Sequence, residues 1–312
     1  MTQTTPIAPI DASRLRIGVA GWSYPDWKDT VYRIPVRPEQ PDLFGRTSPE
    51  TFRYPDRELP YLARFVDLVE INSSFYRIPQ PRHAESWAQQ VEHHPQFRFT
   101  AKLHQDFTHE GRQNTGEAET FRTALTPLVR TGRLTGLLAQ FRYDFRFSFE
   151  GRERIRWLNE QFGPFAPLVV EVRHRSWQQK AALDFFKEHN ITVANLDYPT
   201  AADSFDMPCC ITSTRNAYFR LHGRNRQAWF ASRKNPHEPY DYDYPDSEIS
   251  ELANRARKLL QNVKHLTIVA NNHYRGKAVS AAVRLKAALT RQKVPIPPAL
   301  LQTYPALKRI AR

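Results

Sequence analysis

The chain has 312 residues, of which 40% are hydrophobic, so it can bury a sizeable core and wholesale disorder is excluded. Its formal net charge of +13 and isoelectric point of about 9.9 favour an anionic partner or substrate, although the Arg residues are scattered and form no basic tail. The sequence has no apolar run of about 18 residues, no signal-like start and only two, adjacent cysteines, which excludes a spanning helix and a disulfide framework and favours a cytoplasmic location.

Eight segments have the composition and alternation of β-strands, and most of them precede a helical pattern. In chain order, the predicted strands cover residues 14–20, 68–73, 97–103, 134–141, part of 168–177, 192–197, 217–223 and 265–271. The predicted helices cover residues 56–66, 82–92, 117–130, 151–162, 178–189 and 246–262, and a last helix starts at about Lys277. A short, proline-containing link, without a predicted helix, joins the sixth and seventh strands.

Strands that alternate with helices predict an α/β protein with a parallel sheet, and eight is the number of strands that closes a (β/α)8 TIM-like barrel. We expect one barrel domain over residues 14–294, with an irregular cap over residues 23–55 after the first strand. Residues 1–13 are expected to be a flexible lead-in, and residues 295–312 a tail that packs on the barrel or trails from it. A doubly wound open sheet is the alternative, but no GxGxxG fingerprint follows any predicted strand.

Polar side chains occur near the end of nearly every predicted strand. In the segment LVVEVRHRSW, alternation puts Glu171 and Arg173 on one face and Val170 and Val172 on the other. Active sites of such barrels lie at the carboxyl ends of the strands, and buried charges must be paired. We therefore expect a functional cavity, with a purely structural polar layer as the alternative. The other strand-end residues are Glu70, Asn72, Lys102, Gln140, Asn195, Asp197, Arg220, His222, Asn271 and Asn272.

The chemistry of each group suggests its role. We expect Glu70, Glu171 and Asp197 to act as general acids or bases. Lys102 is expected to stabilise an oxyanion or act as an amine nucleophile, and His222 to relay a proton or serve as a hydrogen-bonded anchor. The residues expected to bind substrate are Trp22, Tyr24, Asn72, Tyr76, Gln140, Arg173, His174, Asn195, Arg220, Arg224, Asn271, Asn272 and Lys277.

An anion-binding position is predicted after the last strand. Gly276 and Lys277 open the final helix there, and a helix amino end at this place often holds an anion in barrels. Arg220, Arg224 and Lys277 are therefore expected to hold the anionic part of a substrate, and the reacting side is expected to contain Glu70, Lys102 and Glu171.

No cofactor and no metal ligand is predicted. A divalent metal ion is a weaker option, because carboxylates and His222 are suitable ligand types in oxygen-rich barrels. No HExxH or paired HxH motif supports such a site, and Lys102 and several Arg side chains would repel a cation.

Several motifs at these strand ends resemble one family. They are GWSYPDW at 21–27, VEINSSFYRIP at 69–79, the FTAK…FTH region at 99–109, LLAQF at 137–141, VEVRHRSW at 170–177, RLHGR at 220–224 and NNHYRGKA at 271–278. Together they resemble the YecE-like family, a domain of unknown function (number 72) whose members resemble TIM barrels. The resemblance implies the barrel but no reaction. The chain departs from the family at Gly18–Trp22, where GVAGW replaces the usual GTSGW, at Arg142-Tyr143 in place of a proline pair, and at residues 37–54, which resemble an insertion.

The expected function is that of a cytoplasmic barrel enzyme that applies acid–base chemistry to a small anionic substrate, either phosphorylated or polyhydroxylated. Isomerase, lyase and hydrolase activities remain open, and so does the oligomeric state. The alternative is a nucleic-acid-associated or nuclease-like barrel, suggested by the net charge of +13 and by the aromatic- and Arg-bearing loop at 224–245. A ligand-binding sensor without turnover is a third option. No association with a membrane is expected.

Overall fold

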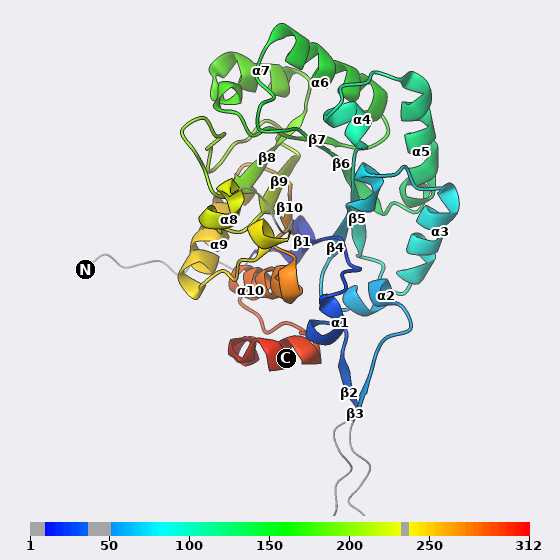
Figure 1. Ribbon diagram of the computed structural model, residues 1–312, viewed down its shortest axis with the longest axis vertical. Coiled ribbons are helices and arrows are strands. Elements are labelled where there is room, and N and C mark those ends of the chain that lie inside the picture. Colours follow the sequence, from blue (N-terminus) through cyan, green and yellow to red (C-terminus); the bar gives the residue numbers. More distant parts are fainter. Residues whose placement is uncertain (1–9, 37–50, 232–236) are drawn as a thin grey trace, which may run out of the picture.

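The computed structural model describes residues 10–36, 51–231 and 237–312, and the structural statements below concern these residues. Eight parallel strands form a closed barrel in the order β1-β10-β9-β8-β7-β6-β5-β4, and β1 pairs with β4 to complete the ring (Figure 1). This closure confirms the predicted TIM-like barrel and excludes the open sheet. The barrel strands are β1 (Leu15–Ala20), β4 (Leu68–Ile71), β5 (Arg98–Lys102), β6 (Leu134–Gln140), β7 (Leu168–Glu171), β8 (Thr192–Asp197), β9 (Asn216–Leu221) and β10 (His265–Ala270).

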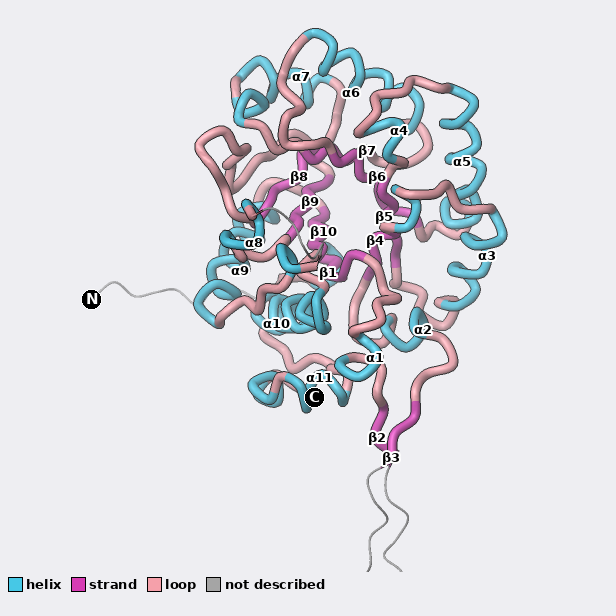
Figure 2. The backbone as a smooth tube through the Cα atoms, in the orientation of Figure 1, coloured by secondary structure: helices cyan, strands magenta, loops and turns pink. Residues whose placement is uncertain are grey.

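The helices surround the ring of strands (Figure 2). A helix separates consecutive barrel strands except between β8 and β9, where residues 198–215 contain no helix, as the sequence predicted. The main helices are α2 (Glu58–Leu62), α3 (Pro81–Gln90), α5 (Thr115–Arg130), α6 (Phe149–Phe162), α7 (Lys180–Glu188), α9 (Asp246–Leu260) and α10 (Lys277–Thr290). Short helical segments that sequence reasoning missed are η1 (Ala12–Arg14), α1 (Trp27–Thr30), η2 (Ser73–Phe75), α4 (Gln105–Thr108), η3 (Arg175–Gln178), α8 (Arg226–Phe230), η4 (Glu238–Tyr240) and η5 (Tyr274–Gly276).

Side-chain caps define where several helices begin. The Ser148 hydroxyl accepts a hydrogen bond from the Gly151 backbone N–H at 3.0 Å, so α6 begins at Phe149, two residues before the predicted start. Asn114 caps α5 in the same way by accepting from the Glu117 N–H at 3.1 Å. These caps satisfy N–H groups that have no partner inside the helix.

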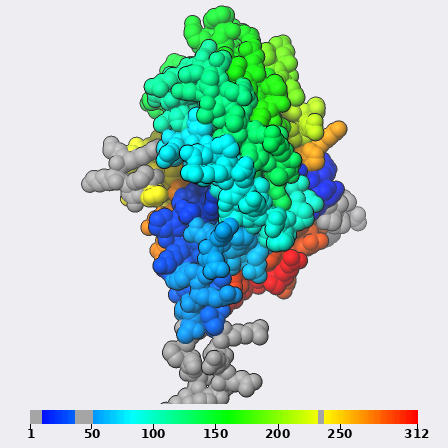
Figure 3. All heavy atoms as spheres, turned by 90° about the vertical axis from the view of Figure 1, so that its right-hand side faces the viewer, coloured from blue at the N-terminus to red at the C-terminus, as the bar shows by residue number. Residues whose placement is uncertain are grey.

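The cap after β1 and the carboxyl-terminal segment lie next to each other. Strands β2 (Ile34–Val36) and β3 (Thr51–Arg53) pair antiparallel and project from the barrel (Figure 1). Helices α11 (Pro298–Thr303) and η6 (Pro305–Arg309) occupy the predicted tail, and α11 contacts α1 and β2. Figure 3 shows the red carboxyl-terminal atoms against blue atoms of the amino-terminal part. Most of the lead-in (1–9), of the insertion (37–50) and part of the loop at 224–245 (232–236) lie outside the described residues.

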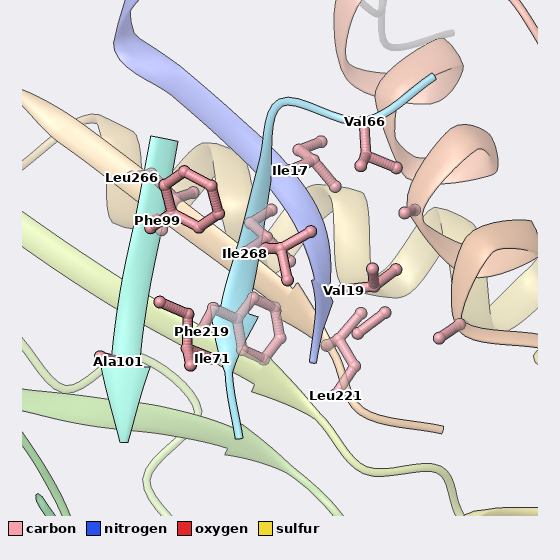
Figure 4. Close-up of a cluster of buried hydrophobic side chains, with 14 of the residues drawn as sticks. Ile17, Val19, Val66, Ile71, Phe99, Ala101, Phe219, Leu221, Leu266 and Ile268 are labelled. Atoms are coloured by element: carbon pink, nitrogen blue, oxygen red, sulfur yellow. The ribbon is translucent and has the colours of Figure 1, made fainter. Parts of the chain in front are cut away.

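The two faces of the barrel sheet carry different cores. The outer face packs against the helices, and Figure 4 shows side chains from β1, β4, β5, β9 and β10 in this layer, among them Ile17, Ile71 and Phe219. A smaller cluster draws its buried members from the strands alone and fills the inside of the barrel. We call it the apolar layer, and it consists of Ala20, Leu68, Leu138, Val169, Ala194, Leu196, Tyr218 and Val269.

Among the described residues, no helix has the length and apolar character needed to cross a membrane. Both cysteines are free thiols; Cys209 is exposed and Cys210 is buried.

Candidate functional site

A cavity of about 470 Å³ lies at the carboxyl ends of the barrel strands. Its lining residues follow or end β1, β4, β5, β6, β9 and β10, which is where active sites of this fold are found. They are Gly21, Trp22, Ser23, Tyr24, Asn72, Ser73, Tyr76, Lys102, Gln140, Arg220, His237, Tyr240, Asn271 and His273. Eight of the residues predicted to form a site are in this set. Four more, Glu70, Glu171, Arg173 and His222, do not line the cavity but are connected to its lining residues by hydrogen bonds.

Arg220 is the centre of a buried charge network. Its side chain is 1% exposed, and its two terminal nitrogens donate to different carboxylates, Glu171 Oε2 at 2.5 Å and Glu70 Oε1 at 2.6 Å. A third hydrogen bond reaches Gln140 Oε1 at 3.1 Å. Burial disfavours the charge, but the two carboxylates outweigh it and raise the pKa of Arg220. The guanidinium therefore ties β4, β6 and β7 to β9 across the barrel.

Glu171 receives two guanidinium groups. Arg173 donates to Glu171 Oε1 from Nε at 3.0 Å and from Nη2 at 2.7 Å, while Arg220 binds the other oxygen. Burial alone would raise the pKa of Glu171, but Arg220 and Arg173 overcome it and hold the pKa well below its ordinary value. Glu171 is therefore ionised at neutral pH and is better suited to positioning cations than to carrying a proton.

Glu70 accepts a hydrogen bond from Tyr218, which in turn contacts Thr100; neither residue was predicted to belong to the site. Tyr218 donates its hydroxyl to Glu70 Oε2 at 2.8 Å, and Thr100 Oγ1 lies 2.9 Å from the same hydroxyl. Tyr218 precedes Arg220 and His222 on the inward face of β9, so strand alternation was a usable signal for it. Burial and the nearby Glu70 charge raise the pKa of Tyr218 well above its ordinary value.

Lys102 is a cation in the cavity lining that has no anionic partner among the described residues. No hydrogen bond or ion pair joins its ammonium to the residues that the structure describes, and Nζ lies 3.7 Å from the ring centroid of Phe75. Burial and the neighbouring Arg220 lower the pKa of Lys102 to about 7, against the opposing effect of Glu171 and Glu70. Both protonation states are thus populated near neutral pH.

His222 is fully buried between Asn271 and Glu171. Its Nδ1 lies 3.0 Å from Asn271 Nδ2, and its Nε2 lies 3.5 Å from Glu171 Oε1. Burial lowers the pKa of His222 to about 4 despite the attraction of Glu171, so the ring is neutral at physiological pH. A neutral ring that accepts from Asn271 at Nδ1 carries its proton on Nε2, facing Glu171.

Aromatic side chains form the rim of the cavity. Trp22 meets Trp87 edge-on at 5.7 Å between ring centroids, and Tyr24 stacks on His273 at 4.5 Å. Gly21 has φ +74°, and a Cβ at this position would lie 2.5 Å from the Tyr24 hydroxyl, so the turn after β1 requires glycine. Lining residues that sequence reasoning did not select are Ser23, Ser73, His237, Tyr240 and His273, of which His273 was visible in the quoted motif NNHYRGKA.

Two predicted site residues on β8 face away from the cavity. Ala194 and Leu196 belong to the apolar layer inside the barrel, so Asn195 and Asp197 point outward. Asn195 exchanges hydrogen bonds with the Cys210 backbone at 2.7 and 3.0 Å, and Asp197 binds Arg255 of α9 at 3.2 Å. All six residues of β8 are buried, so its alternation gave no signal for which face points inward.

Four further residues are committed elsewhere and do not line the cavity. Arg224 binds Asp197 Oδ1 at 2.7 Å and Glu251 at 3.0 Å, and Lys277 pairs with Asp241. His174 caps η3 through the Ser176 N–H at 3.1 Å, and Asn272 donates to the Tyr242 carbonyl at 2.9 Å. The structure thus brings Arg220, but not Arg224 or Lys277, next to Lys102.

The described residues contain no group of three or more His, Cys, Asp or Glu side chains that could hold a metal ion. Glu70 and Glu171, the inward carboxylates, each bind the guanidinium of Arg220 instead.

The closed barrel and the charged cavity at its carboxyl ends define a TIM-barrel protein with a polar site in the usual place for this fold. The chain belongs to the DUF72 family, described as "Protein of unknown function DUF72", whose sequence profile matches residues 16–304. This membership confirms the resemblance inferred from the strand-end motifs.

Proteins similar to this chain come from several bacteria. The UPF0759 protein YunF of Bacillus subtilis is 28% identical over 241 residues, covering 71% of this chain and 83% of YunF. The crystal structure of a DUF72 family protein from Thermotoga maritima matches with a TM-score of 0.69 and 29% identity, over 88% of this chain and 98% of that one. A DUF72 family protein from Enterococcus faecalis matches with a TM-score of 0.72 and 22% identity, over 88% and 95% of the two chains.

Proposed function

We propose that this protein is an enzyme that binds a small anionic substrate in the cavity at the carboxyl ends of the strands and uses Lys102 as its proton-transferring group. The observation that carries the proposal is the Lys102 ammonium, which faces the cavity without an acceptor among the described residues. Lys102, Arg173 and Arg220 supply three positive charges against the two carboxylates Glu70 and Glu171. When Lys102 is protonated, one positive charge is left over, so an anion is the ligand that balances the site.

Lys102 is suited to acid–base chemistry because its pKa lies close to neutral pH. A pKa of about 7 keeps part of the amine unprotonated, and a general base works best when its pKa is near the operating pH. Once Lys102 has taken up the proton, its positive charge can stabilise negative charge that develops on the substrate in the transition state. Proton abstraction next to a carbonyl group, as in an isomerase or a lyase, is a reaction that fits these two features.

The substrate class follows from the lining of the cavity. Asn72, Ser73, Gln140 and Asn271 offer amide and hydroxyl groups that can bind substrate hydroxyls, and the volume of about 470 Å³ is in the usual range for small molecules. The rim aromatics offer flat faces to a ring. We therefore propose a polyhydroxylated substrate that carries a phosphate or carboxylate group.

The test is a thermal-shift screen of sugar phosphates and sugar acids, followed by activity assays on the compounds that stabilise the protein. We expect a stabilising compound to lose its effect in Lys102→Met, and to keep part of it in Lys102→Arg, which retains the charge but not a titratable amine near neutral pH. Arg82→Gln, an exposed position on α3, is the matched control for loss of one positive charge. Stabilisation that persists unchanged in Lys102→Met would contradict the proposal.

A nucleic-acid ligand is the second candidate, supported by exposed aromatic side chains, of which Tyr76 lines the cavity. Tyr76 is 72% exposed, Tyr143 69%, Phe149 65% and Phe230 51%, and all four lie in segments that follow carboxyl ends of barrel strands. Bases stack on such rings, and the net charge of +13 favours a phosphate backbone. Binding to a fluorescent single strand should then weaken steeply with salt and with Tyr76→Ala. No binding at low ionic strength eliminates this candidate.

A further inference from the structure

A second cavity, of about 820 Å³, lies at the opposite end of the barrel. Most of its lining residues lie at or just before the starts of β1 and β6 to β10, and four of them carry cationic or ionisable nitrogen groups, namely Arg16, His189, Arg215 and His265. His189 Nδ1 lies 2.9 Å from the Phe185 carbonyl oxygen, so the other three groups carry the argument. Arg16 is on β1, His265 opens β10, and Arg215 immediately precedes β9, so Arg16, Arg215 and His265 come from neighbouring strands of the ring. We call this place the amino-terminal opening.

The apolar layer separates the amino-terminal opening from the site described above. Arg16 and Ala20 share the inward face of β1, as His265 and Val269 share that of β10, and the second residue of each pair belongs to the apolar layer. A ligand in the amino-terminal opening would thus not touch Lys102, and each cavity can be tested by itself.

Arg16 points into the barrel with no acceptor of its own. No hydrogen bond or ion pair joins its guanidinium to the described residues, and burial together with Arg98 lowers the pKa of Arg16. Asp67 acts in the opposite direction, but its carboxylate is already bound by Lys286 Nζ at 2.6 Å and by the Ile17 N–H at 3.1 Å. A partly buried guanidinium without an acceptor is costly unless solvent or an anion satisfies it.

Near Arg16, Arg215 adds positive potential and His265 adds a hydrogen-bond donor. The Arg215 side chain has no hydrogen bond or ion pair with described residues, and His265 Nδ1 is buried without a hydrogen-bond partner. Burial lowers the pKa of His265, and Arg16 and Arg215 lower it further, so the ring is neutral and can donate from Nδ1. One carboxylate, the exposed Glu160, is in the lining, and it forms no ion pair with either arginine.

We propose that the amino-terminal opening binds a small phosphorylated anion with at least two negative charges, held by Arg16, Arg215 and His265. The planar guanidinium matches phosphate oxygens with two parallel hydrogen bonds, and two such groups without other acceptors favour more than one negative charge. The volume has room for a diphosphate with an organic group attached. Active sites of TIM barrels lie at the other end of the strands, so a ligand bound here would act at a distance from the cavity that contains Lys102.

Isothermal titration calorimetry with pyrophosphate at low ionic strength tests the proposal. The titrations use the full chain with Lys102→Met as the starting protein, so that the lysine of the other cavity does not contribute. We expect saturable binding that weakens at least about tenfold on adding Arg16→Gln or Arg215→Gln, and that is unchanged on adding the control Arg82→Gln. Because Arg215 is exposed, Arg215→Gln should leave the melting temperature without ligand unchanged, which keeps the test valid if Arg16→Gln folds poorly.

Two outcomes would overturn the proposal. One is the absence of saturable pyrophosphate binding in the Lys102→Met protein. The other is an affinity that falls equally in Arg215→Gln and Arg82→Gln, which would indicate general attraction to a basic protein. Neither outcome bears on Lys102, so a failure here is distinct from a failure of the proposed function.

Discussion

The ammonium of Lys102 lies 3.7 Å from the ring centroid of Phe75 and forms no ion pair or hydrogen bond with a described carboxylate. The aromatic face offers the cation a weak attraction, typically about 0.5–2 kcal/mol, which is less than an ion pair in the same surroundings would supply. The ring therefore helps to position the Lys102 side chain, while the pKa of the amine stays at about 7. This combination distinguishes Lys102 from Arg220, whose charge is fixed by two carboxylates.

The proposed role of Lys102 predicts a pH profile. If the neutral amine is the base, kcat/KM for a substrate found by the screen should rise about tenfold per pH unit below pH 7 and level off above it, because this ratio reports the free enzyme. Steady-state kinetics between pH 5.5 and 8.5 measures this. A profile that is flat from pH 6 to 8 would rule out Lys102 as the base.

The same pKa shift predicts a stability effect. The folded protein disfavours the Lys102 charge, so between the folded pKa of about 7 and the ordinary value of 10.5 the unfolded chain binds more protons and stability rises with pH. Lys102→Met removes the penalty, and we expect it to raise the free energy of unfolding by about 1–3 kcal/mol at pH 6.5, with a smaller gain at pH 9.5. Urea unfolding at the two pH values provides the comparison; a gain that grows with pH would refute the assignment.

Arg220 should be essential to stability. Arg220→Met would leave Glu70 and Glu171 buried without their shared cation, and breaking a buried pair in this way typically costs about 3–5 kcal/mol. Adding Glu70→Gln and Glu171→Gln should recover part of this loss because the stranded charges are removed. Chemical denaturation of the single and triple variants measures both effects. A loss below about 1 kcal/mol would mean that solvent reaches the network.

His222 should make the protein sensitive to mild acid. Its folded pKa of about 4 lies below the ordinary value of 6.5, so the unfolded chain takes up the proton first and stability falls as the pH drops from 6.5 towards 4. Wild type should lose about 2 kcal/mol more than His222→Gln between pH 7 and pH 5. Urea unfolding of both proteins at these pH values tests this, and equal losses would indicate that His222 is not buried in solution.

Arg224 and Asp197 should affect stability but not ligand binding. Their ion pair lies outside the cavity, and Asp197 keeps Arg255 and Tyr244 as partners when Arg224 is removed. Arg224→Ala should therefore cost about 0.5–2 kcal/mol of stability while the Kd of any ligand lost in Lys102→Met stays unchanged. Calorimetry and melting curves on the same samples separate the two effects. Weaker ligand binding in Arg224→Ala would contradict this prediction and indicate that Arg224 belongs to the binding site.

Strand alternation was sufficient for those inward residues whose strands have distinguishable faces. In β4 and β9 the acidic and basic side chains alternate with Val, Ile, Phe and Leu, so Glu70 and Arg220 could be assigned to the inside of the barrel. In β8 both faces are buried, and the polar Asn195 and Asp197 proved to face α9 and the adjoining loop while Ala194 and Leu196 fill the interior. The polarity of a side chain does not indicate which face of a strand it lies on when hydrogen-bonding partners are available on both faces.

The barrel, the strand ends and the family could all be predicted before the structure was known, because they depend on local periodicity and on motifs that can be read in order. The pairing of charges, in contrast, could be assigned only from the three-dimensional arrangement of the side chains. Arg220 reaches Glu70, 150 residues away in the chain, whereas Arg224 is taken by Asp197 and Lys277 by Asp241. Ion pairing depends on distances between segments that are remote in sequence, so the unpaired state of Lys102 became visible only when every neighbouring carboxylate had been assigned to another cation.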